Sequence, residues 1–161
     1  RSLVEKIRQV TAKPLWAKLS PNVTDPRVIA RACVEAGADA LCLINTIAGM
    51  AVDWRSRRPL LAHDTGGLSG PAIKPVALRM VHQVSQALPR TPLVGIGGIV
   101  SGTDVCEFLV AGAGAVQVGT ANYANPRALC VLAGELAGAL SAEGLASARE
   151  LTGTLRPNRV P

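Results

Sequence analysis

Apolar residues in this chain form short continuous runs that alternate with longer stretches in which they recur every three or four positions. The short runs predict strands at residues 15–19, 40–45, 93–97 and 115–119. The longer stretches predict helices at 2–10, 25–36, 71–88, 102–111 and from 126 to about 140. A strand is followed by a helix four times over. We therefore expect an α/β fold in which helices cover parallel strands.

The helix at 25–36 shows how local residues set these boundaries. Thr24 is its expected N-cap, and Pro26 stands in its first turn, where a missing N–H costs nothing. Its apolar face is expected to be formed by Val28, Ile29, Ala32, Cys33 and Ala36.

A short internal repeat supports the parallel arrangement. Residues 36–41 (Ala-Gly-Ala-Asp-Ala-Leu) recur as Ala-Gly-Ala-Gly-Ala-Val at 111–116. Gly37 and Gly112 are therefore both expected to end a helix. Each is followed by a buried strand, so one helix–turn–strand unit is used twice.

Four strand–helix units amount to half of an eight-stranded barrel, and such a half has two open strand edges. The chain begins with Arg1, already inside a helical pattern, so we expect a piece of a longer protein. The expectation is a single domain over 1–161 that forms the C-terminal half of a (β/α)8 TIM barrel. The N-terminal half would be absent, and 152–161 would be a loose tail.

Composition narrows the function classes. Apolar residues make up 48% of the chain and aromatic residues only 2%, and the formal net charge is +6. Arg55, Arg57 and Arg58 form the one dense basic cluster. With so few aromatic residues there is no stacking surface for single-stranded nucleic acid. A solvated loop or a subunit contact is the better interpretation of this cluster.

The four cysteines, Cys33, Cys42, Cys106 and Cys130, lie among apolar neighbours. None is part of a Cys-x-x-Cys pair, and none has a histidine at ligand spacing. Buried free thiols are expected rather than disulfides or metal ligands, which suits a cytoplasmic setting. No apolar run approaches the roughly 20 residues of a membrane helix.

Two glycine-containing turns are the strongest chemical signal. Gly97-Gly98 and Gly119-Thr120 lie 22 residues apart, each at the end of a predicted strand. Loops after the last two strands of a barrel commonly bind phosphate, and glycine lets backbone N–H groups approach it closely. The sequence therefore predicts a phosphorylated ligand.

Polar residues end the first two strands. Lys18 stands in an otherwise apolar strand, which favours a cation held for an anionic ligand over a surface lysine. Asn45 and Thr46 follow the second strand. The Asn45 amide could bind a ring with adjacent N–H and C=O groups, or it could cap a turn.

The segment 46–70 shows little periodicity and ends in a glycine-rich stretch before a helix. Structureless connections of this length are often lids or binding loops, although a flexible hinge is the alternative. Lys74 follows in the first turn of the helix, where a solvated side chain is expected.

Four stretches in order resemble dihydroorotate dehydrogenases, most of all the NAD-linked type (class 1B). The match in order and spacing runs from about residue 3 to residue 140, and no single stretch would be specific alone. The stretches are Lys-Leu-Ser-Pro-Asn-Val-Thr-Asp at 18–25, Ile-Asn-Thr at 44–46, Thr-Gly-Gly-Leu-Ser-Gly-Pro-Ala-Ile-Lys-Pro at 65–75 and Gly-Thr-Ala-Asn at 119–122.

The resemblance implies a flavin enzyme of pyrimidine (UMP) synthesis that oxidises (S)-dihydroorotate to orotate with FMN. Lys18 would lie against the flavin ring, and Asn45 and Thr46 would bind the pyrimidine. The remaining residues implied at the cofactor are Ile44 and Gly70 along the flavin and Gly97, Gly98, Gly119 and Thr120 around its phosphate.

The resemblance also implies what this chain lacks. The family's catalytic cysteine has no matching motif here, so no catalytic residue is assigned in this chain, and it would be inactive alone. No metal site is expected. Electrons would pass to NAD through a second subunit carrying FAD and a [2Fe–2S] cluster, because this chain shows no cluster-ligand spacing. A homodimer within a heterotetramer is implied. His63-Asp64 departs from the family's usual stretch and leaves the detail of the lid open.

Two other functions stay open from the residues. One is a flavin domain like that of dihydropyrimidine dehydrogenase, which shares the Lys-Leu-(Ser/Thr)-Pro-Asn phrase, although the Ile-Asn-Thr and glycine-rich stretches favour dihydroorotate dehydrogenase. The other is a phosphate-binding half-barrel that acts as a scaffold without turnover.

Overall fold

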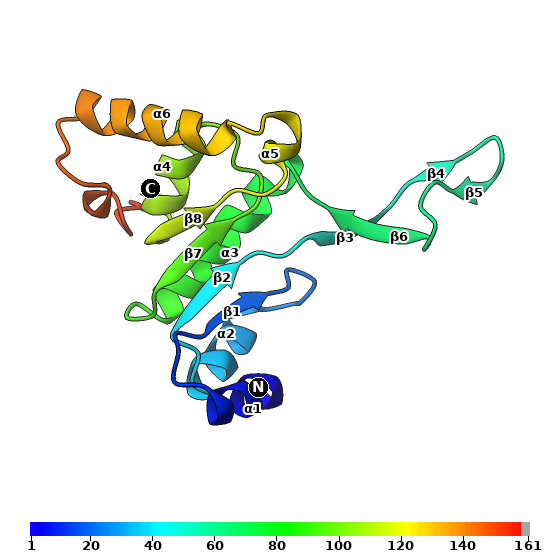
Figure 1. Ribbon diagram of the computed structural model, residues 1–161, viewed down its shortest axis with the longest axis horizontal. Helices are drawn as coiled ribbons and strands as arrows, with labels where there is room; N and C mark the ends of the chain where they lie inside the picture. Colours follow the sequence, from blue (N-terminus) through cyan, green and yellow to red (C-terminus); the bar gives the residue numbers. More distant parts are fainter. Residues whose placement is uncertain (159–161) are drawn as a thin grey trace.

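A four-stranded parallel sheet forms the centre of the computed structural model, which describes residues 1–158 (Figure 1). Its strand order is β1-β2-β7-β8, and every neighbouring pair is parallel, as the repeated strand–helix pattern predicted. The strands are β1 (Trp16–Leu19), β2 (Ala40–Leu43), β7 (Leu93–Ile96) and β8 (Ala115–Gln117).

The helices follow the predicted order, with two short additions, α5 and η2, which are too short to show a helical period in the sequence. The helix predicted at 71–88 consists of a 3-10 turn, η1, followed directly by α3. The helical elements are α1 (Ser2–Val10), α2 (Pro26–Glu35), η1 (Pro71–Ile73), α3 (Lys74–Ala87), α4 (Gly102–Val110), α5 (Ala121–Ala124), α6 (Ala128–Ala142) and η2 (Ala148–Glu150).

The start of α2 differs from the prediction. Asp25, not Thr24, is its N-cap, and the Asp25 carboxylate accepts a hydrogen bond from the Arg27 N–H at 2.9 Å. Val28 and Ile29 are exposed, and the buried face is centred on Ala30 and Cys33. Helix α2 packs against β1 and α3, and Cys33 and Ala36 of the predicted face are buried.

The two faces of the sheet have different surroundings. Helices α2, α3 and α4 pack against its strands and share one core with Leu41, Leu43 and Phe108. Cys42 is in register with Lys18 and with Val94, on the opposite side of the pleat. Within residues 1–158, β1 and β8 each pair on one side only. The sheet therefore has the two open edges expected for half of a barrel.

One glycine in β7 is required by the core. A Cβ atom on Gly95 would lie 2.4 Å from Cδ1 of Phe108, which is fully buried. We expect Gly95→Ala to lower the free energy of unfolding by roughly 1–3 kcal/mol, because the core must rearrange. Urea denaturation measures this change. Gly138→Ala in α6, where a Cβ meets nothing within 4 Å, should leave stability equal or higher. Equal losses in the two variants would show that Gly95 is not held by this contact.

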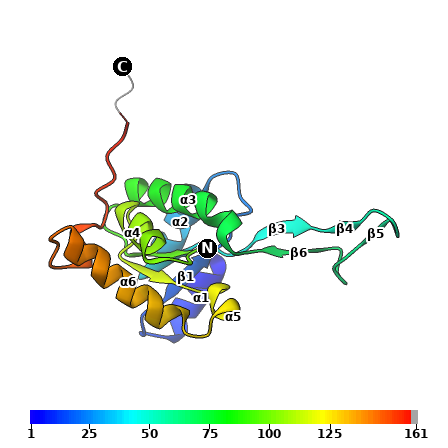
Figure 2. The ribbon, with the colours of Figure 1, turned by 90° about the horizontal axis from the view of Figure 1, so that it is seen from above.

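The segment 46–70 is not structureless, contrary to the prediction. It forms an antiparallel arm in which β3 (Ile47–Met50) pairs with β6 (Thr65–Leu68), and β4 (Val52–Asp53) pairs with β5 (Arg58–Pro59). Figure 2 shows that the arm extends away from the body of the molecule. The pairing escaped prediction because β6 contains two glycines and its partner lies far along the chain.

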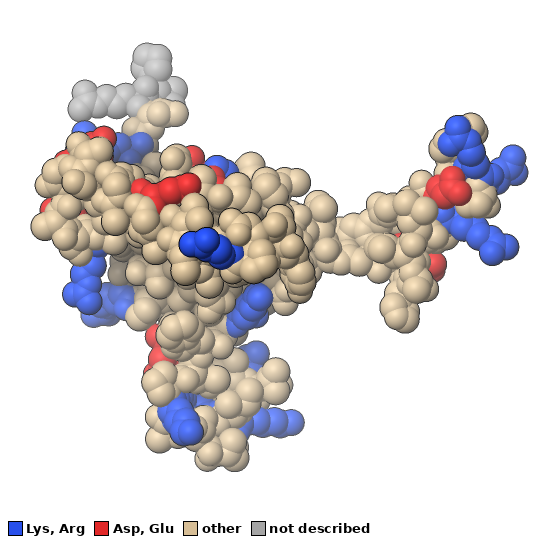
Figure 3. All heavy atoms as spheres, turned by 45° about the horizontal axis from the view of Figure 1, so that its top comes forward, with Lys and Arg blue, Asp and Glu red and all other residues tan. Residues whose placement is uncertain are grey.

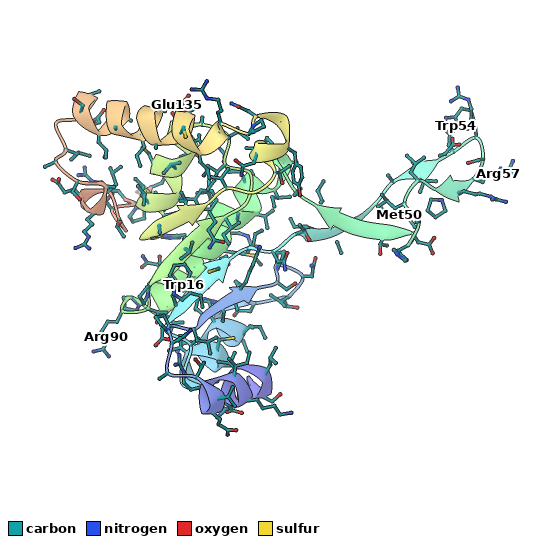
Figure 4. All side chains as sticks on the ribbon, viewed as in Figure 1. Trp16, Met50, Trp54, Arg57, Arg90 and Glu135 are labelled. Carbon is teal, nitrogen blue, oxygen red and sulfur yellow. The ribbon has the colours of Figure 1, made fainter. Side chains whose placement is uncertain are left out.

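The far part of the arm is basic and exposes large apolar side chains. Figure 3 shows Lys and Arg side chains gathered at its end, and Figure 4 places Trp54 and Arg57 there and Met50 further back. The guanidinium of Arg55 lies 4.6 Å from the centre of the Trp54 ring. Met50 and Trp54 are exposed, so this surface is more than a solvated loop of charges.

The chain after η2 is anchored where a loose tail was expected. The Thr152 hydroxyl donates to the carbonyl of Ala113, the Gly153 N–H donates to that of Leu109, and the Leu155 N–H donates to that of Val110. The rest of the expected tail includes 159–161, which lie outside the described residues.

The four cysteines are free thiols, as predicted, but they are not all buried. Cys33 and Cys42 are buried, Cys106 is partly buried, and Cys130 is exposed on α6. Helix α6 is apolar on nearly every side, so its sequence does not show which face turns inward. None of the helices within 1–158 combines the length and apolar character needed to cross a membrane.

Candidate functional site

A cavity of about 750 Å³ lies beyond the carboxyl ends of the four parallel strands. Every residue that the sequence analysis singled out for a cofactor or substrate lines it. Those residues are Lys18, Ile44, Asn45, Thr46, Gly70, Gly97, Gly98, Gly119 and Thr120.

Strand direction explains why these residues meet. Lys18 belongs to β1, and the residues 44–46 follow β2 directly. The turn at 97–98 follows β7, and the turn at 119–120 follows β8. Parallel strands end at the same edge of the sheet, so loops from distant parts of the chain converge there. The expected convergence of the two glycine-containing turns is confirmed.

The turn after β7 depends on glycine. Gly97 and Gly98 have φ values of 125° and 76°, which side chains strongly disfavour. A Cβ atom on Gly98 would lie 2.9 Å from both the Gly70 carbonyl oxygen and the Lys74 nitrogen. The turn is therefore packed closely against the start of η1 and α3.

The turn after β8 is open by contrast. A Cβ atom on Gly119 would meet nothing within 4 Å among the described residues. No hydrogen bond within 1–158 uses the N–H groups of Gly98, Gly119 or Thr120 as donors. These three donors line one cavity and are free to bind an anion.

Lys18 contributes a positive charge to the cavity. It lies on the sheet face opposite the helices and is exposed. In the described part of the chain its ammonium makes no hydrogen bond or ion pair. An unpaired ammonium at the cavity wall is suited to an anionic group of a ligand.

Asn45 has one of the two roles that the sequence left open, and its geometry is compatible with the other. Its Oδ1 accepts a hydrogen bond from the Thr46 N–H at 2.8 Å, so it caps the turn after β2. Its side-chain NH₂ group donates no hydrogen bond within 1–158. The amide therefore still has donors for a ligand in the cavity.

Two further residues support the cavity. Asn22 donates from Nδ2 to the Thr46 carbonyl at 3.2 Å and accepts from the Ala48 N–H at 2.9 Å, so it fixes the chain after β2. The Thr120 hydroxyl donates to Ser69 Oγ at 2.9 Å and joins the end of the arm to the turn after β8. Ser69 lies in a glycine-rich stretch, which is the signal that could have identified it.

Lys74 is not solvated, contrary to the prediction. Its Nζ lies 2.5 Å from Asp104 Oδ1 and 2.8 Å from Glu107 Oε2. Hydrogen bonds to Asp104 and Glu107 raise the pKa of Lys74. Burial alone would raise the pKa of Asp104, but hydrogen bonds from Lys74, Val100 and Ser101 outweigh it and lower that pKa. Both groups are thus held in their charged forms at neutral pH.

Metal ligands are not assembled in this part of the protein. Over the described range 1–158, no group of three or more His, Cys, Asp or Glu side chains could hold a metal ion.

This chain is similar to known proteins over most of its length. A family model described as dihydroorotate dehydrogenase matches residues 1–140. The catalytic subunit of dihydroorotate dehydrogenase B (NAD(+)) from Geotalea daltonii is 58% identical over 154 residues, which cover 96% of this chain and 50% of that protein. Its counterpart from Geobacter metallireducens is 57% identical over 155 residues, or 96% and 50% of the two chains.

The chain spans about half the length of the curated relatives it matches. Half of an eight-stranded barrel has four strands, which agrees with the four-stranded parallel sheet and its two open edges. On this match of sequence over nearly its whole length, the chain belongs to the dihydroorotate dehydrogenase family.

Proposed function

We propose that this chain is part of an FMN-dependent enzyme that oxidises (S)-dihydroorotate to orotate in pyrimidine synthesis. The observation that carries the proposal is the convergence of all nine candidate residues on one cavity. The relatives named above are catalytic subunits of an NAD-linked dihydroorotate dehydrogenase. Their names support the reaction, and the cavity supports the cofactor and the substrate positions.

The cavity fits the phosphate of FMN. Free N–H groups at Gly98, Gly119 and Thr120 can donate to phosphate oxygens, and the space beside Gly119 is open to a ligand. Gly97 and Gly98 shape the turn, while Ile44 and Gly70 line the part proposed for the flavin. Bound FMN supplies the two-electron acceptor of the oxidation.

Lys18 is proposed to hold its ammonium against the flavin ring and to stabilise negative charge there. Its exposure and lack of a protein partner support this role. Asn45 and Thr46 are proposed to bind the pyrimidine. The free NH₂ group of Asn45 can donate to a carbonyl oxygen of the ring.

The catalytic base is proposed to lie outside this chain. None of the four cysteines lines the cavity. Burial raises the pKa of the Cys42 and Cys106 thiols, which makes them poor bases at neutral pH.

Other subunits are proposed to complete the enzyme. A partner carrying FAD and a [2Fe–2S] cluster would pass electrons to NAD, and the catalytic chains would pair within a heterotetramer. The arm supports a subunit contact, because an isolated two-stranded ribbon is marginally stable in water and this one exposes Met50, Val52, Trp54 and Leu60. The cytoplasmic location stays a prediction.

Turnover by the complete protein tests the proposed function. Purified protein with bound FMN should reduce its flavin with dihydroorotate and not with dihydrouracil. Faster reduction by dihydrouracil would favour the function of dihydropyrimidine dehydrogenase. Weak FMN binding without reduction by either compound would favour a scaffold.

Replacing Asn45 with alanine should raise the KM for dihydroorotate by about tenfold or more, because one buried hydrogen bond to the substrate is lost. FMN content should stay unchanged. Asn125→Ala is the matched control, since Asn125 also accepts a local backbone hydrogen bond, from Arg127, but lies outside this cavity. An equal KM for dihydroorotate in both variants would refute the proposed role of Asn45 in substrate binding.

A further inference from the structure

The loop after β7 donates backbone hydrogen bonds to the carboxylates of Asp104 and Glu135. The N–H groups of Val100 and Ser101 each donate to Asp104 Oδ2 at 2.8 Å, and the Gly102 N–H donates to Glu135 Oε2 at 2.6 Å. Three successive amides are thereby directed to acidic side chains. The amide of Gly98, just before them, makes no such bond within 1–158 and lines the cavity.

Asp104 is a buried charge that needs a partner. Its exposed fraction is 5%, and no other charged residue in the described range is buried to this degree. A buried carboxylate is costly unless it is both hydrogen-bonded and neutralised. Two backbone amides provide hydrogen bonds, and the Lys74 ammonium at 2.5 Å provides the opposite charge.

The backbone of Lys74 also lies close to the turn at Gly97-Gly98. A Cβ atom on Gly98 would lie only 2.9 Å from the Lys74 backbone nitrogen. Lys74 does not itself line the cavity. It therefore adjoins both the turn and the buried carboxylate without contacting a ligand in the cavity.

We infer that Lys74 is a positioning residue that neutralises Asp104, so that this carboxylate can orient the loop beside a bound phosphate without repelling it. The inference rests on the proposed function, because the anion is taken to be the phosphate of FMN. An uncompensated Asp104 carboxylate, which accepts hydrogen bonds from this loop, would repel a phosphate bound at Gly98. Lys74 thus acts on the phosphate through Asp104 rather than by direct contact.

A comparison of FMN binding with riboflavin binding distinguishes this role of Lys74 from a general packing role. Both are measured by quenching of flavin fluorescence on the complete protein freed of flavin. Lys74→Met should weaken FMN binding by roughly 10- to 100-fold, as expected for breaking a buried charge pair. The affinity for riboflavin, which lacks the phosphate, should fall much less. Lys74→Arg keeps the charge and should bind FMN nearly as the unmodified protein does.

The double variant Lys74→Met with Asp104→Asn tests the coupling directly. Removing the carboxylate removes the repulsion, so the double variant should bind FMN more tightly than Lys74→Met alone. Asp25→Asn is the matched control, because the Asp25 carboxylate also accepts a backbone hydrogen bond at the start of a helix but does not line the cavity. An equal loss of FMN and riboflavin affinity, or no recovery in the double variant, would overturn the inference.

The effect of pH on FMN binding by Lys74→Met distinguishes charge compensation from a packing role. The charged groups facing Asp104 are Lys74 on α3 and Glu107 on α4, with Glu135 of α6 bonded nearby at Gly102. Without Lys74 the pKa of Asp104 should rise, because the hydrogen bond that lowers it is lost. The loss of FMN affinity in Lys74→Met, relative to the unmodified protein, should therefore be smaller at pH 5 than at pH 8. A loss of affinity that does not depend on pH would count against the inference.

Hydrogen exchange keeps the inference testable if the proposed cofactor is wrong. Failure of the unmodified protein to bind FMN would refute the proposed function alone. The amides of Val100 and Ser101 should still exchange faster in Asp104→Asn than in Asp25→Asn, because they lose a charged acceptor. Unchanged exchange at these two amides would refute the loop-holding role of Asp104 and, with it, the role of Lys74.

Discussion

Replacing Gly119 with valine is expected to weaken FMN binding by about a hundredfold or more, since two hydrogen bonds to a charged phosphate contribute about 1.5 kcal/mol each. The protein itself leaves room for the new side chain, because a Cβ at this position meets nothing within 4 Å. The backbone at Gly119 is not in the left-handed region, so valine adds no strain there. Its methyl groups would occupy the space proposed for the phosphate.

Flavin content after purification and the FMN dissociation constant measure this effect. Gly134→Val is the matched control, because Gly134 in α6 is equally free of neighbours within 4 Å and lies away from the cavity. Equal thermal stability of the two variants would show that the loss is local to the site. A yellow Gly119→Val protein with stoichiometric flavin would contradict the phosphate site.

Lys18→Ala should slow the reduction of bound flavin by about 10²- to 10³-fold, the usual effect of removing a charge that stabilises a developing negative charge. Substrate binding should change far less. Because Lys18 is exposed and makes no hydrogen bond or ion pair within 1–158, its loss should not destabilise the fold. The effect would then report on chemistry rather than on structure.

Anaerobic stopped-flow reduction by dihydroorotate measures the rate at saturating substrate. Lys6→Ala on α1 provides a control, since it also removes one exposed ammonium but lies outside the cavity. Reduction at the rate of the unmodified protein in Lys18→Ala would refute the role proposed for this lysine.

The parallel core could be predicted because local residues decide it. Gly37 and Gly112 both have positive φ, at 99° and 119°, and both end helices as the internal repeat indicated. Each strand is a short apolar run between turn formers, and the short run at 40–43 is fully buried. Because parallel strands end at one edge, the order of the elements was enough to bring Gly98 and Thr120 to one cavity.

The features that sequence reasoning missed depend on contacts between distant residues. Ile47 pairs with Leu68 across the arm, and the apolar residues in 46–70 show no periodicity that would predict this pairing. The partner of Lys74 is Asp104, which lies 30 residues further along the chain. A lysine in the first turn of a helix looks solvated until the fold places a buried carboxylate against it.

The predicted and observed starts of α2 differ by one residue, because two neighbouring residues have similar N-cap preferences. Thr24 and Asp25 are both good N-caps, and the extended backbone of Asp25 decides between them in α2. The orientation of α6 is a similar case, because apolar residues occupy most of its faces. Which of them become buried is decided by packing against α4.

A crystal structure of the complete protein with FMN would show where the phosphate binds. We expect its oxygens to lie within about 2.7–3.2 Å of the backbone nitrogens of Gly98 and Thr120. We also expect the Lys18 ammonium to lie beside the flavin ring. A phosphate bound elsewhere, with these two amides facing solvent, would refute the proposed cofactor site.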